Sequence, residues 1–209
     1  MAARGRPRSF DRDTALRRAM EVFWEQGYEA TSMTDLTSAM GIASPSLYAA
    51  FGSKERLFQE AVALYNATEG AAMTRALAEE PTACAAVEAV LRENARVYAG
   101  EDRPSGCMIV LAATNCSPAN APVRDHLATW RRAGAEMMAR RLERAVAEGE
   151  LPAATDTEAV AAFYTTVIQG MSVQARDGAT RADLDKTVDR AMAAWHAVVM
   201  PHGPGRAPA

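Results

Sequence analysis

The sequence predicts an all-α protein, and three observations lead to this prediction. Alanine, the strongest helix former and a poor strand former, supplies 46 of the 209 residues. Helix caps and glycine or proline stops recur along the chain, whereas no segment reads as a convincing strand. With 49% hydrophobic and 23% charged residues, the chain has the composition of a globular protein and not of a disordered one.

About nine helices are expected, and each has a recognisable start and stop. The first four follow caps at Asp11, Ser32, Ser44 and Ser53 and end near Gly27, Gly41, Gly52 and Pro81. The next three cover about 82–99, a short segment after Gly106, and about 122–148. The last two, at about 156–176 and 181–200, follow the capping segments Thr155-Asp156-Thr157-Glu158 and Thr180-Arg181-Ala182-Asp183. The remaining residues, 201–209, are rich in Pro and Gly and are expected to form a flexible tail.

Charge is distributed unevenly along the chain. Residues 1–18 carry six Arg and two Asp, a net charge of +4, although the whole chain has a net charge of −3. A positive front end on a mildly acidic body indicates that one end of the protein meets a polyanion.

Several classes of function are disfavoured by what the sequence lacks. The three cysteines form no paired pattern that predicts a disulfide framework or a zinc site, so we expect no metal and no cofactor. We find no signal peptide and no apolar run near 18 residues, which favours a cytoplasmic protein without a membrane partner. The histidines are isolated and no catalytic motif is present, so we do not expect an enzyme.

The second and third expected helices have the spacing of a helix-turn-helix unit. Leu36, Met40, Ile42 and Leu47 are placed to pack the two helices together, and Gly41 suits the tight turn between them. In such a unit, the second helix lies in the major groove of DNA.

The segment from Thr31 to Glu55 resembles the signature of the TetR family of transcriptional regulators. The resemblance rests on Met40-Gly41-Ile42, a Ser-rich helix start, Leu47-Tyr48-Ala49-Ala50-Phe51 and Ser53-Lys54-Glu55. It implies a ligand-responsive regulator, most simply a repressor, that binds a palindromic double-stranded DNA operator as a homodimer and is released by a small-molecule inducer. Residues 1–52 would form the DNA-binding domain and residues 53–200 the ligand-binding and dimerisation domain.

The resemblance also suggests which residues contact DNA. They are Ser32, Thr34, Ser44, Pro45, Ser46, Tyr48 and Lys54, with Tyr48 and Lys54 at phosphates. Between Ser44 and Ser53 there is no Arg, Lys, Asn or Gln, the side chains that form bidentate contacts with bases. We therefore expect modest direct readout, with DNA shape and backbone contacts carrying more of the recognition.

The N-terminal arm is a further candidate for DNA contact. Arg4, Arg6 and Arg8 surround a Gly-Arg-Pro core of the kind found in minor-groove arms. Arginine favours narrow, A·T-rich minor grooves because the negative potential is concentrated there. The alternative is a solvated tail without a role in binding.

The body is expected to contain a ligand pocket and a dimer interface. The candidate pocket residues are Tyr98, Met108, Leu111, Trp130, Met137 and Phe163, although an apolar residue at such a position belongs to the core more often than to a pocket wall. For the dimer interface, the resemblance points to the last two helices, whose apolar stripes are Ala159, Phe163, Val167, Gly170, Met171 and Gln174, and Leu184, Val188, Met192 and Trp195.

Two alternative functions remain open at this point. Cys107, beside Gly106 at an expected helix start, could be a redox-sensitive or electrophile-sensitive thiol, because a helix N-terminus stabilises a thiolate. Against this, cysteine is often a small buried hydrophobic residue. The second alternative is a helical ligand-binding dimer that does not bind DNA.

Overall fold

The computed structural model describes residues 10–200, and every regular element in that range is helical. The helices are α1 (Arg12–Ala30), α2 (Met33–Met40), α3 (Ser44–Phe51), α4 (Lys54–Thr68), α5 (Ala71–Glu79), α6 (Ala83–Tyr98), α7 (Met108–Leu111), η1 (Pro118–Asn120), α8 (Ala121–Ala147), α9 (Thr157–Arg176), α10 (Arg181–Ala193) and α11 (Trp195–Val199). The all-α prediction is confirmed for these residues. The predicted tail at 201–209 lies outside them.

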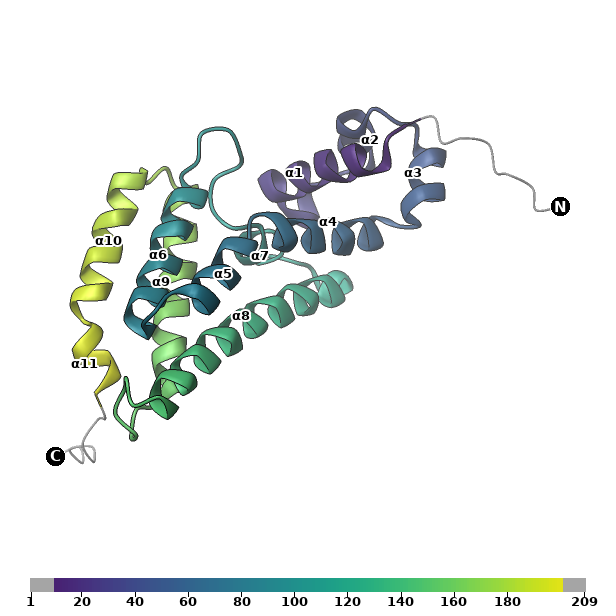
Figure 1. Ribbon diagram of the computed structural model, residues 1–209. Coiled ribbons are helices and arrows are strands. Elements are labelled where there is room, and N and C mark those ends of the chain that lie inside the picture. The colour runs from purple at the N-terminus through teal and green to yellow at the C-terminus, as the bar shows by residue number, and fades with distance from the viewer. Residues whose placement is uncertain (1–9, 201–209) are drawn as a thin grey trace.

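The molecule is elongated, with α1, α2 and α3 gathered at one end (Figure 1). Helix α4 runs along α1 from that end towards the body, where α5, α6, α8 and α9 pack together. Helix α10 covers α6 and α9 at the opposite end of the molecule. The predicted boundary at residues 52–53 therefore falls between α3 and α4, at a place where α4 still packs closely against α1.

Two of the expected helices are each broken in two. The helix predicted from Ser53 to about Glu80 stops at Thr68, because the N–H groups of Glu69 and Gly70 both turn back to the carbonyl of Tyr65. The last predicted helix is interrupted at Ala194, which separates α10 from α11. Neither break coincides with a proline, and the helical spacing of apolar residues continues across both. The sequence therefore predicted one helix in each place.

Helix α1 is kinked at Gly27, where the sequence predicted that the helix would end. Gly27 has φ 77° and ψ 168°, a conformation that L side chains disfavour, and the chain then continues as helix to Ala30. The kink frees the N–H of Tyr28, which donates to the carbonyl oxygen of Ala112 at 2.7 Å. A Cβ on residue 27 would lie 3.2 Å from that oxygen, so glycine also permits the close approach of α7.

Most of the predicted caps are confirmed. Ser32 and Asp35 form a complete capping box on α2, as Thr180 and Asp183 do on α10. Asp11 and Ser53 accept hydrogen bonds from the first turns of α1 and α4.

The predicted cap at Ser44 is wrong. Ala43 is the N-cap of α3, and no side chain accepts a hydrogen bond there. Ser44 is already the first helical residue, because the carbonyl of Ala43 accepts from the N–H groups of Ser46 and Leu47. The Ser44 hydroxyl is therefore not committed to capping the helix.

An aromatic cluster joins α1 to α4. Phe23 and Tyr28 of α1 pack edge-on against Phe58 of α4, at 5.0 and 5.1 Å between ring centroids. About two turns further along α4, Tyr65 is packed edge-on by Trp24 at 4.8 Å. All five rings are buried, so a rotation of α4 cannot leave α1 unchanged.

Candidate nucleic-acid interface and ligand cavity

The helix-turn-helix geometry predicted for α2 and α3 is present. Gly41 caps α2 in the left-handed conformation, with φ 68° and ψ 33°. Leu36, Met40 and Leu47 are buried between the helices, and Ile42 is half-buried. The two helices are therefore held rigidly, with their outer faces free.

Short side chains dominate the outer face of this unit. Of the residues proposed to contact DNA, Ser32, Thr34, Ser44, Pro45 and Tyr48 are exposed, and Ser46 is half-buried. The ring of Tyr48 is 50% exposed, whereas Phe51, one turn later, is buried beneath the guanidinium of Arg12 at 4.3 Å. A large ring that faces solvent at this position is available to a partner, and it contributes nothing to the core.

The side chain of Lys54 is half-buried and in contact with an aromatic ring. Its Nζ lies 4.3 Å from the ring centroid of Tyr28, in a cation–π contact that holds the ammonium at the first turn of α4. Partial burial lowers the pKa of Lys54, and the carboxylate of Glu29 partly offsets this effect. The position fits a phosphate contact made together with the N-terminal amides of α4, with Lys54 already oriented.

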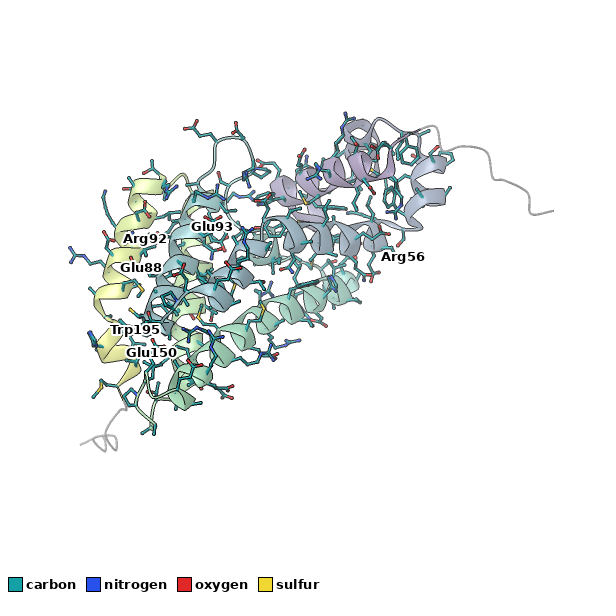
Figure 2. The ribbon with its side chains drawn as sticks, viewed as in Figure 1. Arg56, Glu88, Arg92, Glu93, Glu150 and Trp195 are labelled. Atoms are coloured by element: carbon teal, nitrogen blue, oxygen red, sulfur yellow. The ribbon has the colours of Figure 1, made fainter. Side chains whose placement is uncertain are left out.

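One cation near this surface was missed from the sequence. Arg56 is exposed in the first turn of α4, at the α3 end of the molecule (Figure 2). Among the described residues, no carboxylate lies within ion-pair distance of Arg56. Arg12, by contrast, forms an ion pair with Glu60 at 2.6 Å, so its charge is already compensated within the chain. The arm residues Arg4, Arg6 and Arg8 lie outside the described residues.

A cavity of about 230 Å³ opens between α4, α5, α6, α8 and α9. Tyr98, Trp130 and Met137, three of the proposed pocket residues, line it, as does Cys107. Its two acidic residues are neutralised at the wall, since Glu69 pairs with Arg103, and Glu93 pairs with Arg96.

The structure does not bring the other three proposed pocket residues to this cavity. Met108 is fully buried in the core, and Leu111 packs beside Gly106 outside the cavity lining. Phe163 is 39% exposed on the outer side of α9. Helical periodicity marks each of them as apolar, but it does not tell a cavity wall from a core or an outer surface.

Cys107 is buried, with 8% of its surface exposed, and the thiol-sensing alternative is not favoured. The argument for it required a helix N-terminus, and α7 is a single turn of four residues. The N–H of Cys107 already donates a hydrogen bond to the hydroxyl of Ser172 at 2.8 Å.

Burial, with a smaller contribution from Cys107, raises the pKa of Tyr65 and Tyr98 well above 10, so both phenols stay protonated.

Arg176 connects the last turn of α9 to the helix-turn-helix end. Its guanidinium donates to the carbonyl oxygens of Trp24 at 2.8 Å, Glu25 at 2.7 Å and Ser105 at 3.0 Å. The kink in α1 makes the Trp24 carbonyl available, because Tyr28, which would otherwise donate to it, donates to Ala112. An isolated arginine carries no local sequence signal, so this contact was not predicted from the sequence.

The outer face of α9 differs from the stripe expected at the dimer interface. Ala159, Phe163, Gly170 and Val173 are exposed, at helical spacing, and Gln174 borders them. Met171 of the predicted stripe is buried within the chain. On α10 and α11, Leu184, Val188 and Trp195 are likewise buried against the chain's own α6 and α9, so these residues do not form an outer face.

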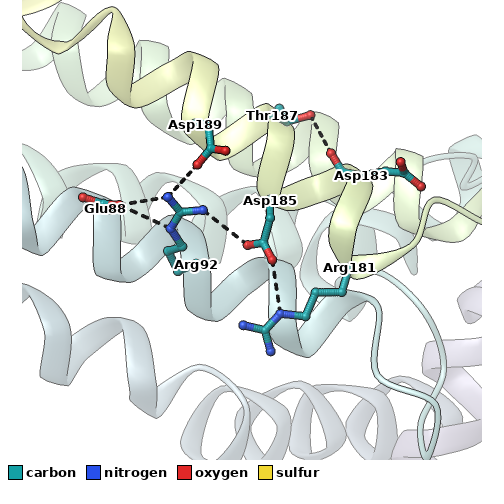
Figure 3. A network of polar contacts seen from close by, with 7 residues as sticks. All are labelled: Glu88, Arg92, Arg181, Asp183, Asp185, Thr187 and Asp189. Atoms are coloured by element: carbon teal, nitrogen blue, oxygen red, sulfur yellow. Dashed lines mark hydrogen bonds and ion pairs between the residues drawn. The ribbon is translucent and has the colours of Figure 1, made fainter.

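Ion pairs fasten α10 to α6. Arg92 of α6 contacts Asp189 at 2.7 Å, Glu88 at 3.0 Å and Asp185 at 3.5 Å (Figure 3). These contacts raise the pKa of Arg92, chiefly through the hydrogen bond with Asp189. The arrangement fixes α10 relative to the cavity-bearing bundle and presents no reactive group.

No metal-binding cluster of His, Cys, Asp or Glu occurs within residues 10–200. Over the same range, no helix is long and apolar enough to cross a membrane.

A rigid helix-turn-helix at one end, joined to a helical bundle with an internal cavity, defines a DNA-binding transcriptional regulator. The comparisons with known proteins identify the family. The model of bacterial regulatory proteins of the tetR family matches residues 15–61, and that of the tetracyclin repressor-like C-terminal domain matches residues 83–195. The chain belongs to the TetR family.

The most similar relatives include two repressors of Escherichia coli K12. The chain is 34% identical to the HTH-type transcriptional repressor ComR over 198 residues, 94% of each chain. It is 31% identical to the repressor BdcR over 178 residues, 83% of each. Among solved structures, a cysteine-substituted TetR family regulator, CifR, in complex with 26 bp operator DNA is 47% identical, with a TM-score of 0.89 over 91% of this chain and all of that one.

Proposed function

We propose that this protein is a homodimeric transcriptional repressor that binds an inverted-repeat DNA operator and leaves it when a small molecule enters the cavity. The observation that carries the proposal is the exposed outer face of α2 and α3, held rigidly at one end of a chain 47% identical to a regulator solved with its operator. The naming of both E. coli relatives as repressors supports repression over activation.

The proposed DNA contacts fall into two groups. Tyr48, Lys54 and Arg56 contact phosphates, with the amides at the start of α4. Ser44 and Ser46 reach base edges with single hydrogen bonds, and Pro45 contacts a thymine methyl group. Because the face lacks bidentate side chains, much of the specificity comes from DNA shape. The arm with Arg4, Arg6 and Arg8 contributes in the adjacent minor groove.

Dimerisation is proposed to use the outer face of α9. Ala159, Phe163, Gly170 and Val173 form an exposed, mainly apolar surface along this helix, and Gly170 has open space around it for close approach. Two such faces paired about a two-fold axis, with α10 alongside, make a four-helix bundle. The same axis would present two copies of α3 to successive major grooves.

Release of the operator is proposed to run from the cavity to α4. Tyr65 and Asn66 of α4 line the cavity, and the same helix packs on α1 through Phe58. A ligand that binds better to one position of α4 than to another therefore changes the spacing between the two α3 helices. Differential affinity is the requirement, since a ligand that binds both states equally shifts nothing.

The test is selection of bound DNA from a random pool, followed by gel-shift titration of the enriched sequence. We expect an inverted repeat, dimeric protein on it, and affinity that falls steeply with salt because several phosphates are contacted. Failure to enrich any sequence would favour a ligand-binding dimer without DNA binding. A nearly flat dependence on salt would contradict the phosphate contacts.

A further inference from the structure

The cavity contains one cation without an acidic partner, Arg131 of α8. One N–H of its guanidinium donates to the carbonyl oxygen of Ile109 at 2.7 Å. Within residues 10–200, no carboxylate lies within ion-pair distance of Arg131. Burial lowers the pKa of Arg131, which means that the site itself disfavours the positive charge.

Arg131 lines the cavity and is only half-buried. Its guanidinium nitrogens are not sealed in the interior without partners, whereas Nε and Nη1 of the buried Arg141 are. A guanidinium has five N–H donors in a fixed fork, and the bond to Ile109 occupies one of them, which leaves the others for a ligand. The cavity acids do not compete, since Glu69 and Glu93 are held by Arg103 and Arg96.

The rest of the cavity wall suits a compact apolar body. Met73, Val97, Ile109, Trp130, Met137 and Ile168 supply apolar surface around Arg131. At about 230 Å³, the cavity is smaller than the roughly 300–1,000 Å³ that drug-sized ligands occupy. The lining also includes polar side chains, among them Asn94 and Gln169. A planar guanidinium beside the apolar surface matches a carboxylate, which accepts two parallel hydrogen bonds from it.

We propose that the ligand of this cavity is a small organic carboxylate, whose apolar part lies against Trp130 and Met137 and whose carboxylate binds Arg131. This proposal names the chemical class of the small molecule in the proposed function. Binding of a carboxylate does not depend on that function, but its role in releasing the operator does. A carboxylate supplies the counter-charge that Arg131 lacks, in a site where water screens the pair poorly.

The experiment titrates the full-length protein, without DNA, with acetate, butyrate, hexanoate, benzoate and phenylacetate, each against its neutral amide. Binding is read from the fluorescence of Trp130, in a variant where Trp24 and Trp195 are replaced by Phe and folding is checked by circular dichroism, and from calorimetry of the unchanged protein. We expect at least one acid to bind about tenfold or more tightly than its own amide, because only the acid forms charge-assisted bonds.

The matched variants are Arg131→Gln and Arg132→Gln. Both are on α8, but Arg132 lies outside the cavity lining and is exposed, with one hydrogen bond to Thr129. We expect Arg131→Gln to lose about tenfold or more in affinity for the acid and nothing for the amide, and Arg132→Gln to behave as the wild type.

Three outcomes would overturn the proposal. They are amides that bind as tightly as acids, an Arg131→Gln variant with full affinity for the acid, and no binding by any acid in a series that spans the size of the cavity. The readout is separate from DNA binding. If the protein binds operator but no carboxylate, the proposed function stands and only the ligand class is wrong. If it binds a carboxylate but no DNA, the ligand class stands and the proposed function is wrong.

Discussion

Replacing Arg176 by Met tests the connection between α9 and the helix-turn-helix end. The substitution keeps most of the apolar length of the side chain but removes the donors to the carbonyls of Trp24, Glu25 and Ser105. A hydrogen bond from a charged donor contributes about 1.5–3 kcal/mol, and the three are not additive. Since Arg176 is half-buried and water can reach the Glu25 carbonyl, we expect a loss of about 3 kcal/mol in the free energy of unfolding.

The assay is reversible unfolding in urea at fixed protein concentration, with melting temperature as a second measure. A loss of about 3 kcal/mol lowers the Tm of a chain of this size by about 6–12 °C. The matched control is Arg17→Met, because Arg17 is exposed on α1 and makes no hydrogen bond or ion pair within the described residues. Its effect should stay within about 0.5 kcal/mol.

Arg176→Lys separates charge from geometry. Lysine keeps the positive charge near the end of α9, but a single ammonium cannot reproduce the planar fork that contacts three carbonyls. We expect a stability between those of the wild type and Arg176→Met. If Arg176→Met is as stable as Arg17→Met, the three hydrogen bonds do not hold α9 to α1, and the reasoning fails.

Four further outcomes are expected from the sequence and the structure together. Tyr48→Phe removes a hydroxyl from an exposed ring, so it should weaken DNA binding by about 1 kcal/mol on all sequences alike in gel shifts, without changing stability. Deletion of residues 1–8 should weaken binding most on operators with A·T-rich flanks, measured against G·C-rich flanks. Phe163→Asp should give folded monomers in sedimentation, because it places a charge on an exposed apolar face; a stable dimer would move the interface elsewhere. Hydrogen bonds with Thr180 lower the pKa of Asp183 from 3.8 to about 2, so its stabilising effect is complete above pH 4 and is lost as the pH falls towards 2; acid titration of Asp183→Asn should lack this component.

The sequence predicted local features well because their causes are local. The capping box at Ser32, the turn at Gly41 and the cap at Ser53 each need only a few neighbouring residues. The cap at Ser44 was misplaced by one residue, since Ser-Pro reads as a cap even when an alanine takes that position.

Partners distant in the sequence were less predictable. Met171 and Trp195 are spaced like an interface stripe, but they are buried in the chain's own core, because periodicity gives a face and not its partner. Among cavity residues, Trp130 was predicted from its apolar character, whereas Arg131 was missed, since an arginine on a long helix normally reads as a solvent-facing residue.

The contacts that close the kink in α1 also determine when this helix can reach its final form. Tyr28 needs the carbonyl of Ala112, the indole N–H of Trp24 donates to the carbonyl of Gly106 at 3.1 Å, and Arg176 arrives last along the chain. During synthesis from the N-terminus, the DNA-binding end therefore emerges long before the residues that complete it. It waits for almost the whole chain, and a truncated product would carry helices α1–α3 with the buried rings of Trp24 and Tyr28 uncovered. Uncovered apolar rings are recognised by chaperones and proteases, so we expect such fragments to be short-lived compared with the complete chain.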